Sequence, residues 1–209
     1  MKGLLLKDLY VLKDSLKVYL IIFLLYGYMG IVEGEIGLMY AMVFITSVVL
    51  PITSVSYDER CGWDRLANTM PVSRKQIVYS KYLLAFILMA GSSLVILLAM
   101  VLVRDATVTE KLAATLSMVA LSMLYQAIML PVILKLGSEK GRIIMMATCF
   151  APIVLVYIVS RFKLFAAFDF AGFMAAYGNI LPYVLAVLVA VAYFISLKFS
   201  VKIYTEKEL

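Results

Sequence analysis

The densest run of charged residues in the chain lies between Asp58 and Lys81, in the segment SYDERCGWDRLANTMPVSRKQIVYSKYL. It holds eight charges and the only tryptophan, Trp63, whereas the residues on both sides are almost purely apolar. Burying the seven charges from Asp58 to Lys75 in lipid would cost about 20 kcal/mol. The segment therefore lies outside a membrane, where it rests on lipid headgroups, docks into a partner's groove or forms a solvated surface loop.

The residues that the sequence lacks argue against several kinds of catalytic site. Histidine is absent, which removes His-activated nucleophiles, the usual zinc sites and histidine proton relays. We expect Cys61 in a loop and Cys149 within a membrane span, and hence no disulfide between them; no metal-ligand spacing is present. Neither a P-loop nor a GxSxG serine motif occurs. An intramembrane enzyme is thus disfavoured.

The composition predicts a membrane protein. The chain has 209 residues, is 65% hydrophobic and has a mean hydropathy of +1.02, whereas soluble domains keep their apolar content near half. Crossing a bilayer core takes roughly 20 apolar residues. We therefore predict an all-α integral membrane fold with six transmembrane helices. The six spans are Val18–Val32, Ile36–Ser56, Val78–Val103, Leu112–Leu134, Ile143–Ser160 and Ile180–Phe199.

Lys and Arg residues are divided unevenly between the two sides that six spans define. The N-terminal lead, the loops after the second and fourth spans and the tail hold fifteen of the 19, and the opposite loops hold four. Lys81 and Lys198, at the ends of their spans, are counted here with the flanking segments. By the positive-inside rule both termini are cytoplasmic. The net charge of +6 is a topology signal, because four short segments share it and none resembles a nucleic-acid surface.

Two further segments are expected to lie in the membrane interface. In residues 1–17, Leu5, Leu9, Leu12 and Leu16 recur at helical spacing between charges, which predicts an amphipathic interfacial helix. A basic lead that only sets the topology fits the same residues. Residues 161–179 alternate phenylalanine with small residues, which favours short re-entrant helices before the last span.

Three segments match the capping box that begins many helices. They are Ser56–Glu59, Ser73–Gln76 and Thr107–Glu110. The first predicts a loop helix from about Tyr57 to Asn68, and Pro71 would end it. Trp63, Leu66 and Met70 would share one face of this helix.

Two parts of the sequence repeat a pattern. In LPITSVSYDERCG and LPVILKLGSEKGR, a Leu-Pro pair is followed eight residues later by Glu59 or Glu139. Pro51 and Pro131 each leave the carbonyl four residues earlier without its helical partner. A chance match and two loops with similar roles both remain open.

The six spans suggest where the energy for any uphill transport would enter. Apart from Lys81 and Lys198 near their ends, they contain no Asp, Glu, Lys or Arg, whereas ion-coupled carriers need such groups in the membrane. Without a P-loop the chain has no ATP site of its own. The energy would then arrive from a partner through the cytoplasmic loops.

The charged segment resembles the loop between spans two and three in permease subunits of bacterial type 2 ABC exporters, particularly the small ones linked to peptide export. Their pattern is close to D-E-x-x-x-W-D, then P-[IVL]-S-R-K-x-[IV]-V-x-[SA]-K-Y. The residues that fill it are Asp58, Glu59, Trp63, Asp64, Pro71, Ser73, Arg74, Lys75, Ile77, Val78, Lys81 and Tyr82. KLGSEKGR, residues 135–142, is similar to the family's second cytoplasmic loop.

The resemblance implies a single permease domain over residues 1–209 and a bacterial cell membrane. Spans 1 and 2 would occupy 18–56, a coupling loop 57–77, spans 3 and 4 78–134, and spans 5 and 6 143–200. Two permease subunits, identical or different, would form the pathway. Two separate ATPase subunits would bind ATP and magnesium, so this chain would hold no cofactor.

The resemblance also implies roles for particular residues. A coupling helix within residues 57–70 would contact the ATPase through Asp58, Glu59, Trp63, Asp64, Arg65 and Leu66. Arg74 and Lys75 would anchor the third span at lipid phosphates or pair with acids of the loop. Glu139 and Arg142 would brace the coupling helix from the second loop.

The substrate is left open by the sequence. Because the spans offer aromatic and hydroxyl side chains, a hydrophobic or amphipathic cargo is expected, either a cytolytic or antimicrobial peptide or a lipid-like molecule. A membrane-embedded substrate-binding subunit of an importer is the alternative, although such a subunit would not need the long charged loop.

Overall fold

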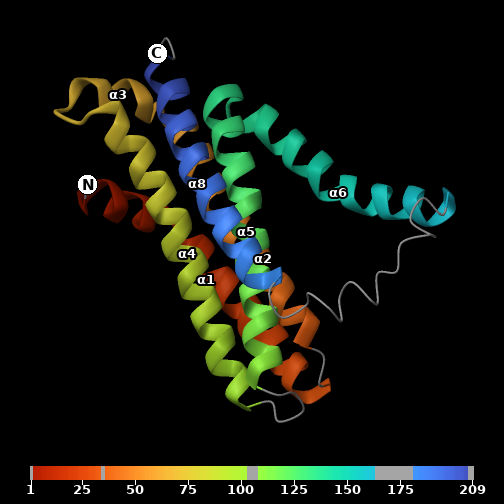
Figure 1. Cartoon of the computed structure of the whole chain (residues 1–209). Helices are drawn as coiled ribbons and strands as arrows, with labels where there is room; N and C mark the ends of the chain where they lie inside the picture. The colour runs from red at the N-terminus through yellow and green to blue at the C-terminus, as the bar shows by residue number, and fades with distance from the viewer. Residues whose placement is uncertain (1, 34–35, 103–107, 163–180, 207–209) are drawn as a thin grey trace.

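The described part of the chain is helical throughout (Figure 1). A computed structural model describes residues 2–33, 36–102, 108–162 and 181–206. The helices are α1 (Lys2–Glu33), α2 (Ile36–Arg60), α3 (Trp63–Thr69), α4 (Arg74–Leu102), α5 (Val108–Leu136), α6 (Ser138–Phe162) and α8 (Leu181–Glu206). An all-helical fold agrees with the sequence prediction.

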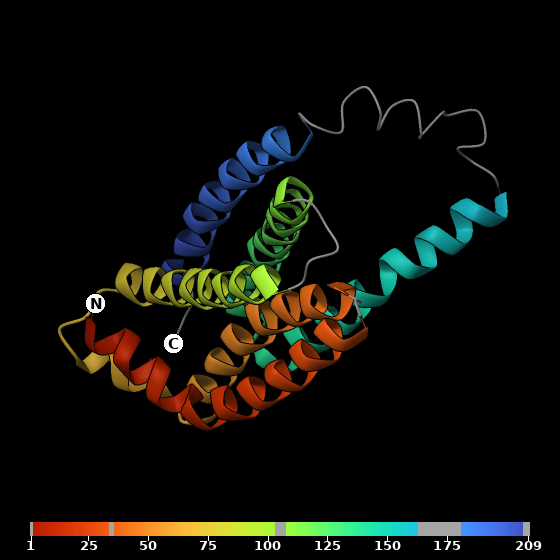
Figure 2. The ribbon, with the colours of Figure 1, turned by 90° about the horizontal axis from the view of Figure 1, so that it is seen from below.

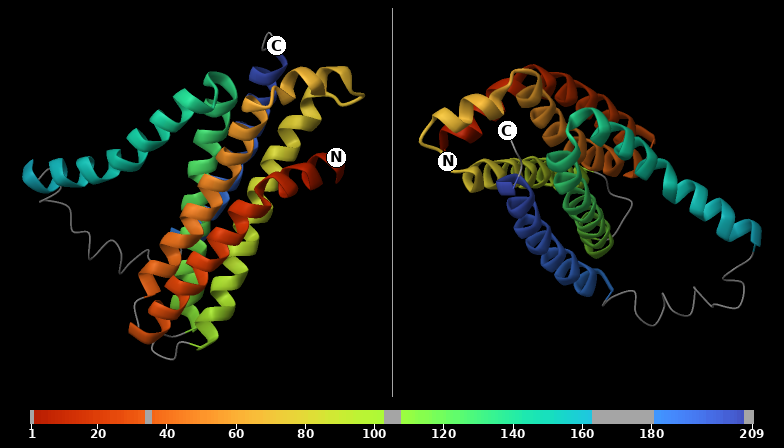
Figure 3. Two further views of the ribbon diagram at one scale, coloured as in Figure 1. Left: turned by 180° about the vertical axis from the view of Figure 1, so that it is seen from behind. Right: turned by 90° about the horizontal axis from the view of Figure 1, so that it is seen from above.

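Helices α1, α2, α4, α5 and α8 form a bundle, and α6 leaves it at a steep angle (Figures 1 and 2). The first part of α1 lies across the bundle before the helix turns to run along it (Figure 3). The start of α1, the short helix α3, the α5–α6 corner and the end of α8 lie toward the same end of the bundle (Figure 1). The segments with most of the basic residues are thus gathered at one end.

Within the described residues, four helices are long and apolar enough to cross a membrane. These stretches are Tyr40–Arg60, Arg74–Leu98, Leu112–Leu136 and Val184–Glu206. They correspond to the second, third, fourth and sixth predicted spans. The first and fifth predicted spans lie within α1 and α6 and are not among the stretches found in the described residues, so six spans are not confirmed. The expected re-entrant segment falls outside the described residues from residue 163 onward.

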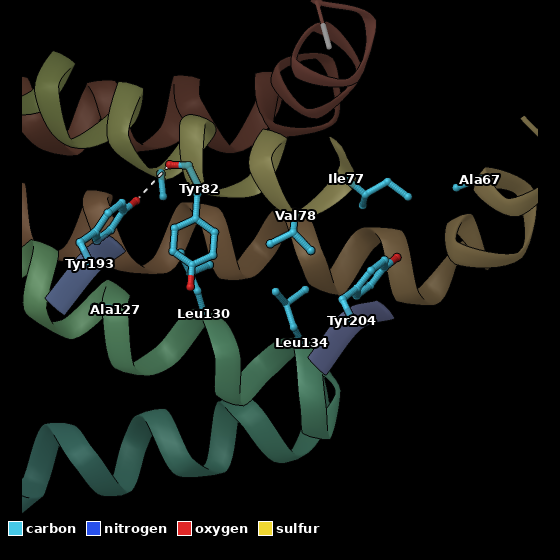
Figure 4. Packing of buried hydrophobic residues seen from close by; sticks show 10 residues of the cluster. Ala67, Ile77, Val78, Tyr82, Ala127, Leu130, Leu134, Tyr193 and Tyr204 are labelled. Atoms are coloured by element: carbon cyan, nitrogen blue, oxygen red, sulfur yellow. Dashed lines mark hydrogen bonds between the residues drawn. The ribbon is translucent and has the colours of Figure 1, made fainter. Parts of the chain in front are cut away.

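One hydrophobic cluster joins α3, α4, α5 and α8 (Figure 4). At its centre Tyr82 and Tyr193 meet edge to face, with ring centroids 5.2 Å apart. The Tyr82 hydroxyl lies 2.7 Å from both Ser196 Oγ and Ser200 Oγ, and the Tyr193 hydroxyl donates to the Tyr82 carbonyl at 3.1 Å. Buried hydroxyls are costly unless they are bonded, so these contacts fix α8 against α4.

The outer faces of the helices are apolar and exposed. On α1 and α8 the exposed side chains include Leu24, Tyr28, Val187 and Phe194. Contiguous apolar surface of this extent is unusual on a soluble monomer. Lipid is the solvent that such faces require.

The two prolines inside helices create hydrogen bonds between helices. Pro51 cannot donate to Ser47 O, and Gln126 Nε2 of α5 donates to that carbonyl at 2.8 Å instead. Pro131 likewise frees Ala127 O, which accepts from Ser196 Oγ of α8. In an apolar medium each backbone carbonyl needs a partner. The prolines therefore specify where α2 meets α5 and where α5 meets α8.

One of the three predicted capping boxes is present. Ser73 Oγ accepts from Gln76 N–H at 3.3 Å, and Gln76 Oε1 accepts from Ser73 N–H at 3.2 Å, which is the predicted capping box of α4. The prediction at Ser56 was wrong, because α2 continues to Arg60 and Ser56 Oγ donates to Ile52 O. The third box includes Thr107, which lies outside the described residues.

The loop helix is shorter than we predicted because of Gly62. Its φ of +63° ends α2, and the helix resumes only at Trp63. Left-handed backbone of this kind favours glycine. Residues 57–60, expected to begin the loop helix, belong to α2.

The pairing of Pro51 with Gln126 predicts non-additive stabilities. Gln126→Met leaves Ser47 O unbonded and should destabilise the protein, whereas Pro51→Ala restores a helical donor. The decrease in unfolding free energy caused by Gln126→Met should then be smaller by about 1 kcal/mol in the Pro51→Ala background. Thermal unfolding in detergent measures all four proteins of this cycle. Pro51→Ala combined with Ser196→Ala is the matched control and should be additive; equal non-additivity in both cycles would refute the pairing.

Candidate functional site

A buried ring of four charges lies beside α3. It is formed by Lys7 and Asp8 of α1, Asp58 of α2 and Lys81 of α4. Asp8 and Lys81 have side chains only 1% and 5% exposed, and those of Asp58 and Lys7 are 10% and 22% exposed. We call this arrangement the ionic ring.

Each lysine in the ionic ring contacts both carboxylates. Lys81 Nζ lies 2.8 Å from Asp8 Oδ1 and 2.6 Å from Asp58 Oδ2, and it donates to Ser54 Oγ at 2.8 Å. The contacts with Asp8 and Ser54 are hydrogen bonds, and the contact with Asp58 Oδ2 is an ion pair. Lys7 Nζ lies 2.6 Å from Asp58 Oδ1 and 3.1 Å from Asp8 Oδ1.

The charges of the ionic ring sum to zero, which is what makes its burial tolerable. Isolated ions at this depth would cost several kcal/mol each, and a pair offsets that cost only when its geometry and hydrogen bonds are good. Removing one member leaves an uncompensated charge. The ring therefore holds α1, α2 and α4 in one relative arrangement.

The ionic ring also reaches α3 through Trp63. Lys7 Nζ lies 4.1 Å from the centroid of the Trp63 ring, a distance suited to a cation–π contact. Trp63 and Val72 pack against the cluster that includes the buried Ala67. A seven-residue helix is too short to be stable alone, so α3 depends on these contacts.

The outward side of α3 differs from its inward side. Leu66 is 50% exposed and Met70 is 40% exposed, whereas Ala67 is buried and Trp63 is partly buried. Our prediction that Trp63, Leu66 and Met70 share one face was wrong, since Trp63 turns inward with Ala67. Leu66 and Met70 remain as the apolar surface that α3 presents outside the chain.

Two of the three acids expected to face an ATPase make contacts within the chain. The Asp58 carboxylate lies within the ionic ring. Glu59 Oε2 accepts from the Ser138 N–H at 2.6 Å, at the first residue of α6, where a negative charge is favourable. Asp64 and Arg65 belong to α3, but their side chains fall outside the described residues.

The second loop reduces to one residue, Gly137, between α5 and α6. Its φ is +84°, and a Cβ atom there would lie 2.5 Å from Glu59 Oε1. Only glycine leaves room for Glu59 to reach the Ser138 N–H. The end of α2 is thereby fixed to the start of α6.

The four supporting residues have separate locations. Arg74 Nη1 donates to Thr205 O at 3.0 Å, which ties the start of α4 to the end of α8. Lys75 and Glu139 are exposed. Arg142 is exposed on α6 and lines a small cavity together with Arg60. The structure thus shows α2 bound to the second loop through Glu59; it shows no contact of Glu139 or Arg142 with α3 among the described residues.

Sequence reasoning missed Lys7, Asp8 and the burial of Lys81. One signal was present, because Asp8 follows Leu5 by three residues and precedes Leu12 by four, so it lies on the apolar face of the N-terminal helix. Lys81 also falls inside the third predicted span. Together, these two positions would have suggested that Asp8 and Lys81 lie at a similar depth and form an ion pair.

The fold and the site define a multi-pass helical membrane protein with most of its basic segments gathered at one end, beside a short helix. The family model of the ABC-2 family transporter proteins matches residues 3–205, and the chain therefore belongs to this family. It is a transmembrane component of an ABC transporter, as the sequence resemblance implied. No curated protein and no solved structure matched the chain.

The ionic ring predicts that its members are interdependent. Lys81→Met leaves two buried carboxylates facing one lysine and should destabilise the protein by about 3–5 kcal/mol. Adding Asp8→Asn restores neutrality and should recover part of the loss. Thermal unfolding in detergent distinguishes the variants. Lys13→Met, an exposed lysine of α1, is the control; a double variant no more stable than Lys81→Met would contradict the ring.

Proposed function

We propose that the chain is the transmembrane subunit of an ATP-driven exporter and that α3 receives force from a separate ATPase subunit. The observation that carries this proposal is the two-sided environment of α3. Its outer side exposes Leu66 and Met70, and its inner side is joined to the ionic ring through Trp63. A push on the outer side would thus be transmitted to α1, α2 and α4.

The apolar outer side supports a protein partner for α3. Leu66 and Met70 form a surface too small to hold a seven-residue helix in lipid, but large enough to fill a groove in a partner. The partner would supply the ATP and magnesium chemistry, because this sequence has no P-loop. Trp63 and Asp58 act in this proposal as positioning residues behind the contact.

The cargo we propose is hydrophobic or amphipathic, a peptide or a lipid-like molecule. A groove of about 300 Å³ between α4 and α8 supports this choice. It is lined by Tyr79, Tyr82, Leu83, Phe86, Tyr193 and Leu197. These side chains offer apolar and aromatic surface and no charge, as an apolar chain requires. A second permease subunit would complete the pathway.

Leu66 provides the direct test of coupling. If Leu66 is an interface anchor, Leu66→Ala should lower the affinity for the ABC ATPase that co-purifies with the wild-type chain by about 2 kcal/mol, or roughly thirtyfold. Leu94→Ala, at a leucine of α4 that is also at least half exposed, is the control. Normal ATPase binding and export by Leu66→Ala would exclude α3 as the coupling contact.

Trp63→Ala separates the outer and inner sides of α3. It removes the cation–π contact with Lys7, so it should lower the melting temperature as well as ATPase binding, whereas Leu66→Ala should affect binding alone. Thermal unfolding of the isolated subunit measures the difference. Equal melting temperatures for the two variants would mean that Trp63 does not support α3 as described.

The orientation can be tested independently of the ATPase. We place both termini and α3 in the cytoplasm of a bacterial cell, because the end that gathers them carries most of the basic residues. With Cys149 replaced by serine, the exposed Cys61 should react with thiol reagents only from the inside. Glu35→Cys, in a background that also has Cys61→Ser, should react from the outside. Labelling of both positions from one side would refute this topology.

A further inference from the structure

A small cavity between α2 and α6 has the chemistry of an anion site. It has a volume of about 140 Å³ and is lined by Thr53, Ser56, Tyr57, Arg60 and Arg142. The first four lie on one face of α2, and Arg142 enters from the second turn of α6. No carboxylate is among these lining residues.

The two arginines carry positive charge that the described residues do not neutralise. None of the ion pairs found among the described residues includes Arg60 or Arg142. The acid next to Arg60 in sequence, Glu59, is directed to the Ser138 N–H. The two guanidinium groups that line the cavity therefore give the site a net charge of +2.

The polar groups in the cavity are arranged for an acceptor-rich ligand. The hydroxyl protons of Thr53 and Ser56 are donated to Val49 O and Ile52 O, which leaves the arginines and Tyr57 as the donors. Guanidinium groups bind phosphate oxygens in pairs, with good geometry and strong charge-assisted bonds. A cavity far larger than one water molecule needs also has room for a phosphate group.

The neighbouring surface of α6 indicates what the phosphate is attached to. Ile143, Met146, Phe150, Val154 and Tyr157 follow Arg142 at intervals of three or four residues, and all are 53–69% exposed. Their spacing places them on one face of α6, where they form an apolar stripe that begins next to Arg142. Helix α6 is the one that leaves the bundle (Figure 2). A headgroup in the cavity would have its acyl chains beside this stripe.

We propose that the Arg60–Arg142 cavity binds the phosphate headgroup of an anionic phospholipid of the cytoplasmic leaflet, with its acyl chains along α6. Basic cavities between membrane helices on this side are suited to such lipids. The lipid would add a link between α2 and α6, which also meet through the Glu59–Ser138 contact and a hydrophobic cluster that includes Val55 and Ile144. The proposal rests on the membrane topology and does not depend on coupling through α3.

Lipid binding by the purified full-length chain tests the proposal. Native mass spectrometry with dioctanoyl phosphatidylglycerol should show one preferred bound lipid, and dioctanoyl phosphatidylcholine should bind more weakly. Arg60→Gln and Arg142→Gln should each lower the affinity about fivefold, and together about 25-fold. Lys140→Gln, which removes an exposed charge two residues from Arg142, is the control. Equal losses in the control and the arginine variants, or no loss in any, would overturn the site.

Two further arms separate the alternatives. Arg60→Lys and Arg142→Lys keep the charge but lose the paired geometry, so an intermediate affinity supports the site even if the glutamine variants fold poorly. Glycerol 3-phosphate competes for the headgroup position without acyl chains. If it binds as tightly as the lipid, a soluble phosphate ester is the ligand and the lipid assignment is wrong. If the double variant keeps lipid but loses the ATPase, the surface belongs to the protein partner instead.

Discussion

The requirement that buried charges be compensated organises the end of the bundle at which α3 lies. Asp8 and Lys81 are almost fully buried, and each is paired with both oppositely charged members of the ionic ring. Because the four members of the ionic ring come from α1, α2 and α4, their mutual satisfaction sets the relative positions of three helices at once. Trp63 then extends the same arrangement to α3 through Lys7. The short helix is thus attached to a rigid base, and the outer side that carries Leu66 has a defined position.

Deeper in the bundle, the described residues of α2, α5 and α8 are joined by hydrogen bonds to backbone carbonyls and not by ion pairs. Each proline leaves one backbone carbonyl without its helical hydrogen bond, and a polar side chain on a neighbouring helix donates to that carbonyl instead. The same physical rule operates at both levels, since an unsatisfied polar group is costly wherever water is excluded. The helices are therefore joined at discrete points, between which apolar surfaces pack without strict direction.

The end of α2 concentrates several of these connections within one turn. Asp58 joins the ionic ring, Glu59 meets the start of α6, and Arg60 lines the cavity beside Arg142. Three consecutive charges thus point to three different partners, as consecutive residues of a helix must, since they are separated by about 100° around its axis. In the proposed mechanism this turn distributes movement of α3 to the core of the bundle, to α6 and to the surrounding lipid.

Much of this architecture was accessible from composition and pattern alone. The apolar stretches, the gathering of basic residues, the capping box at Ser73 and the unpaired carbonyls of the two prolines follow from local rules, and the charged loop led to the family. The tertiary structure decided which charges face inward. Asp58 was expected at a partner surface and Lys81 at a span boundary, yet both are buried, because Lys7 and Asp8 approach them from a helix some fifty to seventy residues away. A charge is stable in an interior only when its partner is present, and the identity of that partner depends on packing between distant segments, which no local pattern of residues records.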